Sequence, residues 1–398
     1  MRTIIRGRVH GLAGDSTSIM VEDGVVTWVG PGPAPDRPDE EIVAAPDELI
    51  APGFVDLQVN GFGGHDAATG QDAIAAISEA LPSTGVTAFL PTLISAPVEA
   101  GAAFAAAAAA AAAGAIGARI LGAHLEGPFI NPSFRGAHER AFVTDPSPRQ
   151  VEVIVSARPR LVTLAPELPG GLEAIARLHA VGIVVSAGHT GADFECGRSA
   201  IASGVRFGTH IYNAMPAIHH RRPGIALALL LDPRVTVGLI ADGEHVHLAV
   251  CEQLIRAKGR SRIALTTDQT AAAGVAPGSY MLSGRRVISD GAVVRLEDGT
   301  LAGSAAAMGH LIRRMSELPG MNVARAIAMA TTVPARVLGE RSLGRIRVGG
   351  SGDIVVLDRD LRVRLTMVGG EVKFQRGAAL GSGSRGHAAS RGGVPPST

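Results

Sequence analysis

Four polar side chains, each following a short apolar run, could form a hydrolytic metal site. They are Glu126, His189, His210 and Asp268. Two imidazoles and a carboxylate suit a borderline divalent cation such as zinc and leave one coordination position for water. A metal lowers the pKa of its bound water, and a carboxylate on another strand can then carry the proton. We therefore expect Glu126, His189 and His210 to bind a metal and Asp268 to act as the acid and base.

The alternative for each of these side chains is a purely structural role. A single histidine or glutamate at a strand end more often caps a helix or satisfies a buried carbonyl. Polar groups nevertheless follow six successive apolar runs, which favours a shared site over chance. His124 and Glu167 stand at two of these positions, and a supporting role fits them equally well. The histidines and arginines at residues 219–222 are expected to lie in a solvated loop.

Alternating apolar runs and helical segments predict the elements that hold these residues. Eight β-like runs are separated by alanine-rich segments with Glu, Arg and Gln at helical spacing, which is typical of parallel strands joined by helical crossovers. Eight such units favour a closed (β/α)8 TIM-like barrel, whose strand ends converge on one face. A doubly wound open sheet is the alternative, but no glycine-rich nucleotide motif supports it. The runs are residues 54–59, 88–91, 120–124, 161–165, 183–187, 205–210, 236–240 and 263–267.

The two ends of the chain show a different pattern, that of short strands with tight turns. The pair Asp23-Gly24 stands between two β-rich runs and is a strong hairpin signal. We expect residues 1–52 and 341–378 to form one small β-sandwich domain and residues 53–340 to form the barrel. Residues 379–398 are rich in Gly, Ser, Arg and Pro, and we expect a disordered tail there.

The composition limits the classes of function. Lys and Arg total 37 and Asp and Glu total 36, so the formal charge of +1 argues against a general nucleic-acid or acidic-membrane binder. Hydrophobic residues make up 46% of the chain, enough to fill a large core. Cys196 and Cys251 cannot form a disulfide framework, and no apolar signal segment follows the N-terminus. A cytoplasmic location is expected.

Several motifs resemble those of the amidohydrolase superfamily and, within it, the N-acetylglucosamine-6-phosphate deacetylase family. They occur in the family's order from about residue 50 to about residue 340. The His-Leu-Glu-Gly-Pro and Asn-Ala-Met-Pro stretches are specific when they occur together. The motifs are Ala-Pro-Gly-Phe-Val-Asp at 51–56, His-Leu-Glu-Gly-Pro at 124–128, Leu-Ala-Pro-Glu at 164–167, Ser-Ala-Gly-His at 186–189, Thr-His-Ile-Tyr-Asn-Ala-Met-Pro at 209–216, Ala-Asp-Gly-Glu-His-Val at 241–246 and Thr-Thr-Asp at 266–268.

This resemblance implies a reaction and the residues that carry it. The reaction is hydrolysis of N-acetylglucosamine 6-phosphate to glucosamine 6-phosphate and acetate. The resemblance implies Glu126, His189 and His210 as ligands of the metal and Asp268 as the acid and base. It also implies that His138 holds and polarises the acetyl carbonyl.

The resemblance further implies how the sugar phosphate is bound. Asn213 and Ala214 match the family's phosphate-binding positions, together with His245 and Arg221. In the family, the arginine that matches Arg221 reaches in from the neighbouring subunit. A homodimer is therefore expected, with Arg221 as a charged contact to the phosphate of the partner's substrate.

The sequence departs from the superfamily pattern at the first strand. An HxH pair for a second metal is common there, but this chain has Gln58 and Asn60. Amides are poor zinc ligands compared with imidazole, so we expect one divalent metal per subunit, zinc first, with iron, manganese or cobalt as alternatives. His65 is a further candidate near the metal. Gln269, which stands where the family usually has a small residue, puts fine specificity in question.

Two competing functions stay open at this level. One is another hydrolase on the same barrel, acting on a different N-acetylhexosamine phosphate or on a cyclic amide. The other is a catalytically silent barrel that binds amino-sugar phosphates. The intact set of Glu126, His189, His210 and Asp268 argues against the silent barrel.

Overall fold

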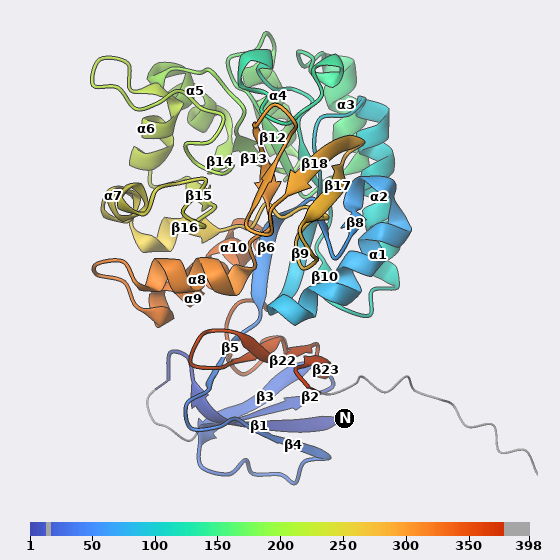
Figure 1. Ribbon diagram of the computed structural model, residues 1–398, viewed down its shortest axis with the longest axis vertical. Coiled ribbons are helices and arrows are strands. Elements are labelled where there is room, and N and C mark those ends of the chain that lie inside the picture. Colours follow the sequence, from blue (N-terminus) through green and yellow to red (C-terminus); the bar gives the residue numbers. More distant parts are fainter. Residues whose placement is uncertain (13–16, 378–398) are drawn as a thin grey trace, which may run out of the picture.

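The computed structural model describes residues 1–12 and 17–377, which form a large barrel above a small β domain (Figure 1). The expected disordered tail at 379–398 lies outside the described residues. Within them, no helix is both long enough and apolar enough to cross a membrane.

Eight parallel strands form the barrel, as the alternating runs predicted, and the (β/α)8 expectation is confirmed over the open-sheet alternative. Neighbouring strands are parallel throughout, from β9 to β16, and β6 pairs with β9. The barrel strands are β6 (Phe54–Val59), β9 (Val86–Leu93), β11 (His124–Glu126), β12 (Leu161–Leu164), β13 (Val184–Ala187), β14 (Val205–Gly208), β15 (Thr236–Leu239) and β16 (Ile263–Leu265).

Helices surround these strands (Figure 1), and their buried apolar residues pack in the core clusters of the barrel. Local signals define their ends. In α3, for example, Ser147 and Gln150 form a capping box before the first turn, and Asp193 caps α5. The helices are α1 (Gln71–Ala80), α2 (Val98–Ala113), α3 (Pro148–Ala157), α4 (Gly171–Ala180), α5 (Phe194–Ser203), α6 (Gly224–Leu231), α7 (Leu248–Lys258), α8 (Met308–Ser316), α9 (Val323–Ala330) and α10 (Thr332–Val337). Short 3-10 turns occur at η1 (Ala67–Thr69), η2 (Leu81–Thr84), η3 (Pro132–Phe134), η4 (Arg140–Phe142) and η5 (Arg260–Arg262).

The third barrel strand differs from the expected run at 120–124. It consists of two pieces on the same edge of β9, namely β10 (Arg119–Ile120) and then β11. Gly122 lies in the gap with a φ of 118°, a conformation that favours glycine. The interruption means that residues 121–123 are not in a strand and that the barrel strand continues as far as Glu126.

Asp56 links the last strand, β16, to the first, β6, beside the backbone hydrogen bonds from Asn60 and Gly61 to the carbonyl of Gln269. Asp56 is fully buried on β6 and accepts hydrogen bonds from the hydroxyls of Thr266, at 2.9 Å, and Thr267, at 2.6 Å. It also accepts from the backbone N–H of Thr267 at 3.2 Å. One isolated parallel bridge, between Val59 and Gln269, completes the seam. Burial raises the pKa of Asp56 to about 6, although these hydrogen bonds act in the opposite direction.

A four-stranded antiparallel sheet, which we call the lid sheet, is inserted after β16. Its strands are β17 (Gly278–Leu282), β18 (Arg285–Ser289), β19 (Val293–Arg295) and β20 (Leu301–Ser304). Figure 1 shows β17 and β18 in front of the barrel. The lid sheet has its own apolar cluster, which includes Ile94 and Ala137 from the barrel loops.

Strands from both chain ends combine in the small β domain, in the order β23-β22-β21-β5-β1-β2-β3, with β4 beside β1. The expected hairpin at Asp23-Gly24 is confirmed, since β2 and β3 pair antiparallel across it. These strands are β1 (Arg2–Val9), β2 (Thr17–Glu22), β3 (Val25–Pro31), β4 (Glu40–Val43), β5 (Leu49–Pro52), β21 (Ile354–Leu357), β22 (Val363–Val368) and β23 (Glu371–Gln375). A short hairpin, β7 (Gly61–Phe62) with β8 (His65–Asp66), follows β6.

Replacing Asp56 by Ala is expected to destabilise the barrel, because it leaves buried hydroxyl and N–H donors without an acceptor. The loss should lower the midpoint of thermal unfolding by roughly 5–10 °C. Differential scanning calorimetry measures this shift. Asp47→Ala, at an exposed aspartate, is the matched control. Equal midpoints for the two variants would show that Asp56 does not close the seam.

Candidate active site

Three of the predicted site residues lie just beyond strand ends and share an uncommon backbone conformation. His189 follows β13 with a φ of 49°, His210 follows β14 with 26°, and Asp268 follows β16 with 51°. Non-glycine residues seldom adopt positive φ, and such strain is typical of functional positions. The left-handed turns allow the chain to leave each strand while its polar side chain faces the cavity at this end of the barrel.

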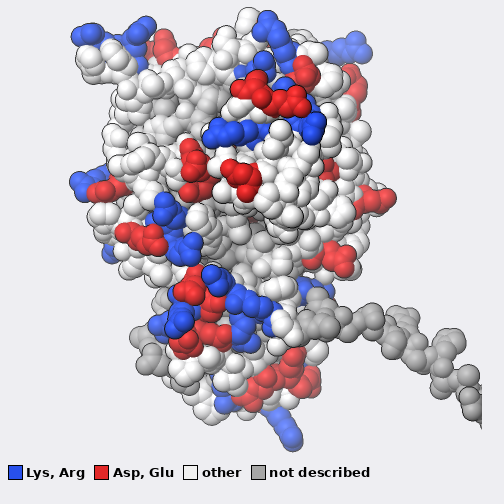
Figure 2. Space-filling model, viewed as in Figure 1, with Lys and Arg blue, Asp and Glu red and all other residues white. Residues whose placement is uncertain are grey.

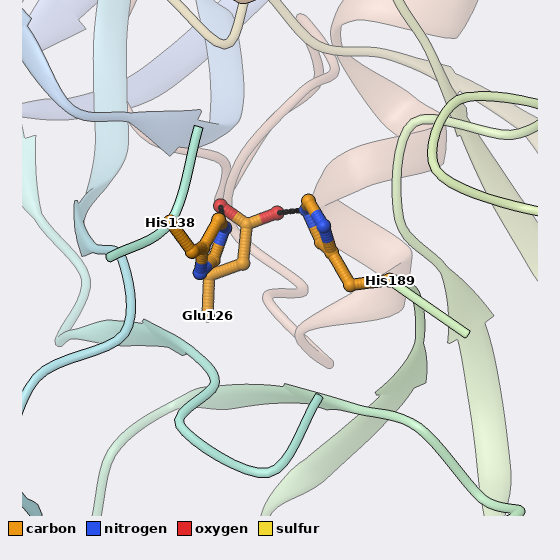
Figure 3. A group of neighbouring side chains, drawn as sticks. All are labelled: Glu126, His138 and His189. Atoms are coloured by element: carbon orange, nitrogen blue, oxygen red, sulfur yellow. Dashed lines mark hydrogen bonds and ion pairs between the residues drawn. The ribbon is translucent and has the colours of Figure 1, made fainter. Parts of the chain in front are cut away.

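The carboxylate of Glu126, at the end of β11, is where the histidines meet. Its Oε1 lies 2.9 Å from Nε2 of His210 and 3.2 Å from Nε2 of His189. The two Nε2 atoms are 3.1 Å apart. Oε2 lies 3.8 Å from Nε2 of His138, and Figure 3 shows Glu126 between the rings of His138 and His189. All four side chains are buried.

This donor set fits a divalent metal. Three ligand atoms at about 2.0–2.1 Å from a tetrahedral zinc lie about 3.3 Å from one another, which is close to the spacing of Glu126, His189 and His210. Burial alone would raise the pKa of Glu126, but hydrogen bonds from the two histidines hold it well below its usual value. Burial alone would lower the pKa of His210, but its hydrogen bond to Glu126 and the charge of that carboxylate raise it.

Hydrogen bonds to Nδ1 distinguish the roles of His138 and His189. The backbone N–H of Ser95 donates to Nδ1 of His138 at 3.1 Å, so a neutral His138 carries its proton on Nε2. His189 Nδ1 instead donates to the carbonyl of Phe134 at 2.9 Å, which leaves a lone pair on Nε2. Burial and the nearby His189 hold the pKa of His138 well below its usual value. His138 is thus suited to donate a hydrogen bond, and His189 to bind a metal.

Asp268 is arranged for proton transfer. Burial, reinforced by the charge of Glu126, raises the pKa of Asp268 to about 7. A carboxyl group with a pKa near neutral can both accept and release a proton. The side-chain amide of Asn60 donates to its Oδ1 at 2.7 Å.

Gln58 and Asn60 act as hydrogen-bond donors in this structure. Gln58 Nε2 donates to Glu126 Oε1 at 3.0 Å, in the same way that Asn60 holds Asp268. The amides therefore orient the two carboxylates from the first strand of the barrel.

A buried network of hydroxyls lies beneath the cluster. His124 Nε2 lies 2.8 Å from Thr163 Oγ1, which lies 2.7 Å from Thr209 Oγ1, and Ser186 Oγ lies 2.6 Å from Thr209 Oγ1. The other ring nitrogen of His124 contacts the carbonyl of Leu57 at 3.1 Å. His124 thus has partners on both nitrogens within the barrel, which favours the supporting role.

Glu167 is committed to the loop after β13. It accepts hydrogen bonds from Thr190 Oγ1, at 2.5 Å, from the N–H of Gly191, at 2.6 Å, and from the amide of Asn131, at 2.9 Å. Its place in the fold is therefore structural.

The cluster opens into a cavity of about 470 Å³, a size suited to a sugar phosphate. Asn213, Ala214 and His245 line it together with the cluster. His245 is held by Asp242, whose Oδ2 lies 2.7 Å from Nδ1.

Two of the predicted site residues lie outside this cavity in the folded chain. His65 is exposed on β8 and does not line this cavity. Arg221 is exposed in the loop before α6 and lines a different cavity, of about 810 Å³. A single chain therefore does not bring Arg221 to the cluster.

A cavity of about 810 Å³ also lies between the small β domain and the barrel. Its lining residues include Arg119, Glu371 and Lys373. It is larger than the cavity over Glu126, but it lacks a buried group of histidines and carboxylates. Figure 2 shows positive and negative side chains mixed over the visible face, without a large surface of one sign. The chemistry therefore favours the smaller cavity.

Some contributors to the site were missed by sequence reasoning. Ser95 was not identified, and no motif marks it. The lid sheet supplies Leu282, Arg295, Thr300 and Leu301 to the cavity wall, and it also was not predicted. Its signals were present, because Ser-Gly at 283–284 and Asp-Gly at 290–291 and 298–299 are hairpin turn pairs between β-rich runs.

Comparison with known proteins gives a consistent result. The model of the amidohydrolase family matches residues 49–373. An N-acetylgalactosamine-6-phosphate deacetylase from Escherichia coli O157:H7 is 34% identical, covering 90% of this chain and 95% of that protein. An N-acetylglucosamine-6-phosphate deacetylase from Rattus norvegicus is 37% identical, covering 82% of this chain and 84% of the relative.

Among solved structures, the fold is similar to that of N-acetyl-D-glucosamine-6-phosphate deacetylase from Mycobacterium smegmatis. That structure is of an aspartate-to-alanine variant in complex with N-acetyl-D-glucosamine-6-phosphate. The TM-score is 0.87 and the sequence identity 33%, over 94% of this chain and 99% of that one.

His189→Gln is expected to lose stoichiometric divalent metal, because it removes one imidazole ligand from the cluster. His65→Gln is the matched control, since this histidine is exposed and lies outside the cavity. Elemental analysis of both purified proteins checks the expectation. Full metal occupancy in His189→Gln would exclude this residue as a ligand.

Proposed function

This chain belongs to the amidohydrolase family, and we propose that it hydrolyses the acetamide of N-acetylglucosamine 6-phosphate to glucosamine 6-phosphate and acetate. The observation that carries the proposal is the buried meeting point of Glu126, His189 and His210, with His138 and Asp268 in the same cavity. Relatives named N-acetylglucosamine-6-phosphate deacetylase match most of the chain.

Glu126, His189 and His210 would hold one divalent metal, for which zinc is the first choice. When bound, the metal polarises the acetamide carbonyl and makes water a stronger nucleophile. The donor roles of Gln58 and Asn60 support a single metal, because these amides already contact Glu126 and Asp268.

His138 stabilises the charge that develops on the carbonyl oxygen. Its Nε2–H faces the cluster, because Ser95 occupies Nδ1. A fixed donor aimed at a developing oxyanion is among the largest single contributions to acyl-transfer catalysis.

Asp268 moves the proton. As a carboxylate it accepts a proton from the attacking water, and it then passes this proton to the departing nitrogen. Protonation is necessary because an amine is too basic to leave as an anion. Asn60 fixes the orientation of the carboxyl group during both steps.

Asn213, Ala214 and His245 bind the phosphate end of the substrate, and Arg221 reaches it from the second subunit of a homodimer. The exposure of Arg221 on the loop before α6 supports this assignment, since the residue has no place in the cavity of its own chain. A guanidinium forms paired, charge-assisted hydrogen bonds to phosphate, which position the acetyl group. We place the enzyme in the cytoplasm, where the free thiols of Cys196 and Cys251 are stable.

A second candidate substrate is N-acetylgalactosamine 6-phosphate. The relative from Escherichia coli O157:H7 is named as a deacetylase of this sugar phosphate. Its match covers a larger share of this chain than that of the relative from Rattus norvegicus. The two sugars differ only in the configuration of one hydroxyl.

Acetate release tests the proposed function. The purified enzyme is expected to release acetate from N-acetylglucosamine 6-phosphate faster than from the galacto epimer or from the unphosphorylated sugar, and a chelator should stop the release. Asp268→Asn should lower turnover by about 1,000-fold while substrate binding persists. Absence of release from all three sugars would favour a silent binding barrel, whereas faster release from the galacto epimer would select the second candidate.

Mixing two inactive variants tests the contribution of Arg221 across the dimer. Arg221→Ala and Asp268→Asn are each expected to have little activity, but a mixed dimer has one site with both residues intact. After unfolding and refolding of an equal mixture, about one quarter of the wild-type activity should return. No recovery, with mixed dimers verified by mass spectrometry, would place Arg221 outside the partner's site.

A further inference from the structure

The lid sheet contacts the backbone on both sides of the cluster. At one side, the N–H of Ser304 on β20 donates to the carbonyl of Asp268 at 2.9 Å, and its hydroxyl donates to the carbonyl of Thr267 at 2.6 Å. At the other side, Arg285 on β18 reaches the loop that carries His138. The lid sheet therefore spans from the proton-transferring residue to the carbonyl-binding one.

Arg285 donates to two successive carbonyls of that loop. Its Nη1 lies 2.7 Å from the carbonyl oxygen of Ala137 and 3.3 Å from that of His138. Its Nε lies 3.8 Å from the carboxylate of Glu139. Arg135 approaches the same carbonyl of His138, at 3.2 Å, from within the loop.

The loop has few other fixed points. Residues 135–139 are neither helix nor strand, and Gly136 has a φ of 53°. Within the loop, the N–H of His138 donates to the carbonyl of Arg135 at 3.0 Å. Ala137 packs into the apolar cluster of the lid sheet. Arg285 is therefore the side chain through which the lid sheet holds the His138 backbone, and Arg135 holds the same carbonyl from within the loop.

We propose that Arg285 is a positioning residue for His138, through which the lid sheet sets the direction of the Nε2–H that binds the acetyl carbonyl. The inference rests on the proposed function for its catalytic consequence. Ser95 contacts the ring and sets which nitrogen is protonated, whereas Arg285 holds the backbone that carries the ring. A shift of about 1 Å in such a group can lower a rate by about 100-fold.

Arg285→Ala is the test, and Arg286→Ala on the same strand is its matched control. Arg286 is more exposed and contacts Ser279 and Glu297 within the lid sheet. We expect Arg285→Ala to lower kcat by about 10–100-fold with KM changed less than about threefold, because the interaction with the transition state is lost. Metal content and the thermal midpoint should stay near those of Arg286→Ala. Added guanidinium should restore part of the lost rate.

A double-mutant cycle separates positioning from a general structural effect. If Arg285 acts through His138, then Arg285→Ala should cost less than about twofold in a His138→Ala background. Full additivity of the two losses would overturn the proposal, as would equal kinetics for Arg285→Ala and Arg286→Ala.

Hydrogen exchange gives a readout that does not depend on turnover. Backbone amides of residues 136–139 should exchange faster in Arg285→Ala than in Arg286→Ala, and those of β6 should not change. Faster exchange in an enzyme that releases no acetate would refute the proposed function but not the positioning of the loop. Unchanged exchange would overturn the positioning itself.

Discussion

The buried carboxylate of Glu126 is the interaction on which the rest of the site depends. Its side chain is 2% exposed, and an unpaired carboxylate at such a place would cost several kcal/mol. His189, His210 and the amide of Gln58 all approach the same oxygen, and His138 faces the other. Each of these groups comes from a different strand end or loop, so satisfying one charge brings the functional groups together.

That convergence requires a barrel that is closed and rigid. Asp56 ties the last strand to the first, next to Thr266 and Thr267, which immediately precede Asp268. The hydroxyls of Thr163, on β12, and Thr209, directly after β14, meet across the intervening strand β13. The polar contacts that join the barrel strands thus lie directly beside Asp268 and His210.

Two histidines with the same chemistry receive different tasks through their neighbours. Ser95 donates to His138, whereas the carbonyl of Phe134 accepts from His189. The same ring therefore presents a proton in one case and a lone pair in the other. The lid sheet adds a second layer of control, because it contacts the backbone of both His138 and Asp268.

The sequence alone determined the barrel. Its short apolar runs are those of parallel strands buried on both faces, and the segments between them have helical spacing. It also located Glu126, His189, His210 and Asp268 at strand ends, since parallel strands end on one face. It could not place Ser95 or Arg285, which act through one N–H and through contacts to backbone carbonyls that no side-chain pattern encodes. The sequence likewise could not show the interruption at Gly122 or the seam at Asp56. Nor could it show that Arg221 lies away from the cavity over Glu126 in the same chain. These features depend on distances between segments far apart in the chain. Only the tertiary structure decides such distances, because hydrogen bonds form between neighbours in space rather than in sequence.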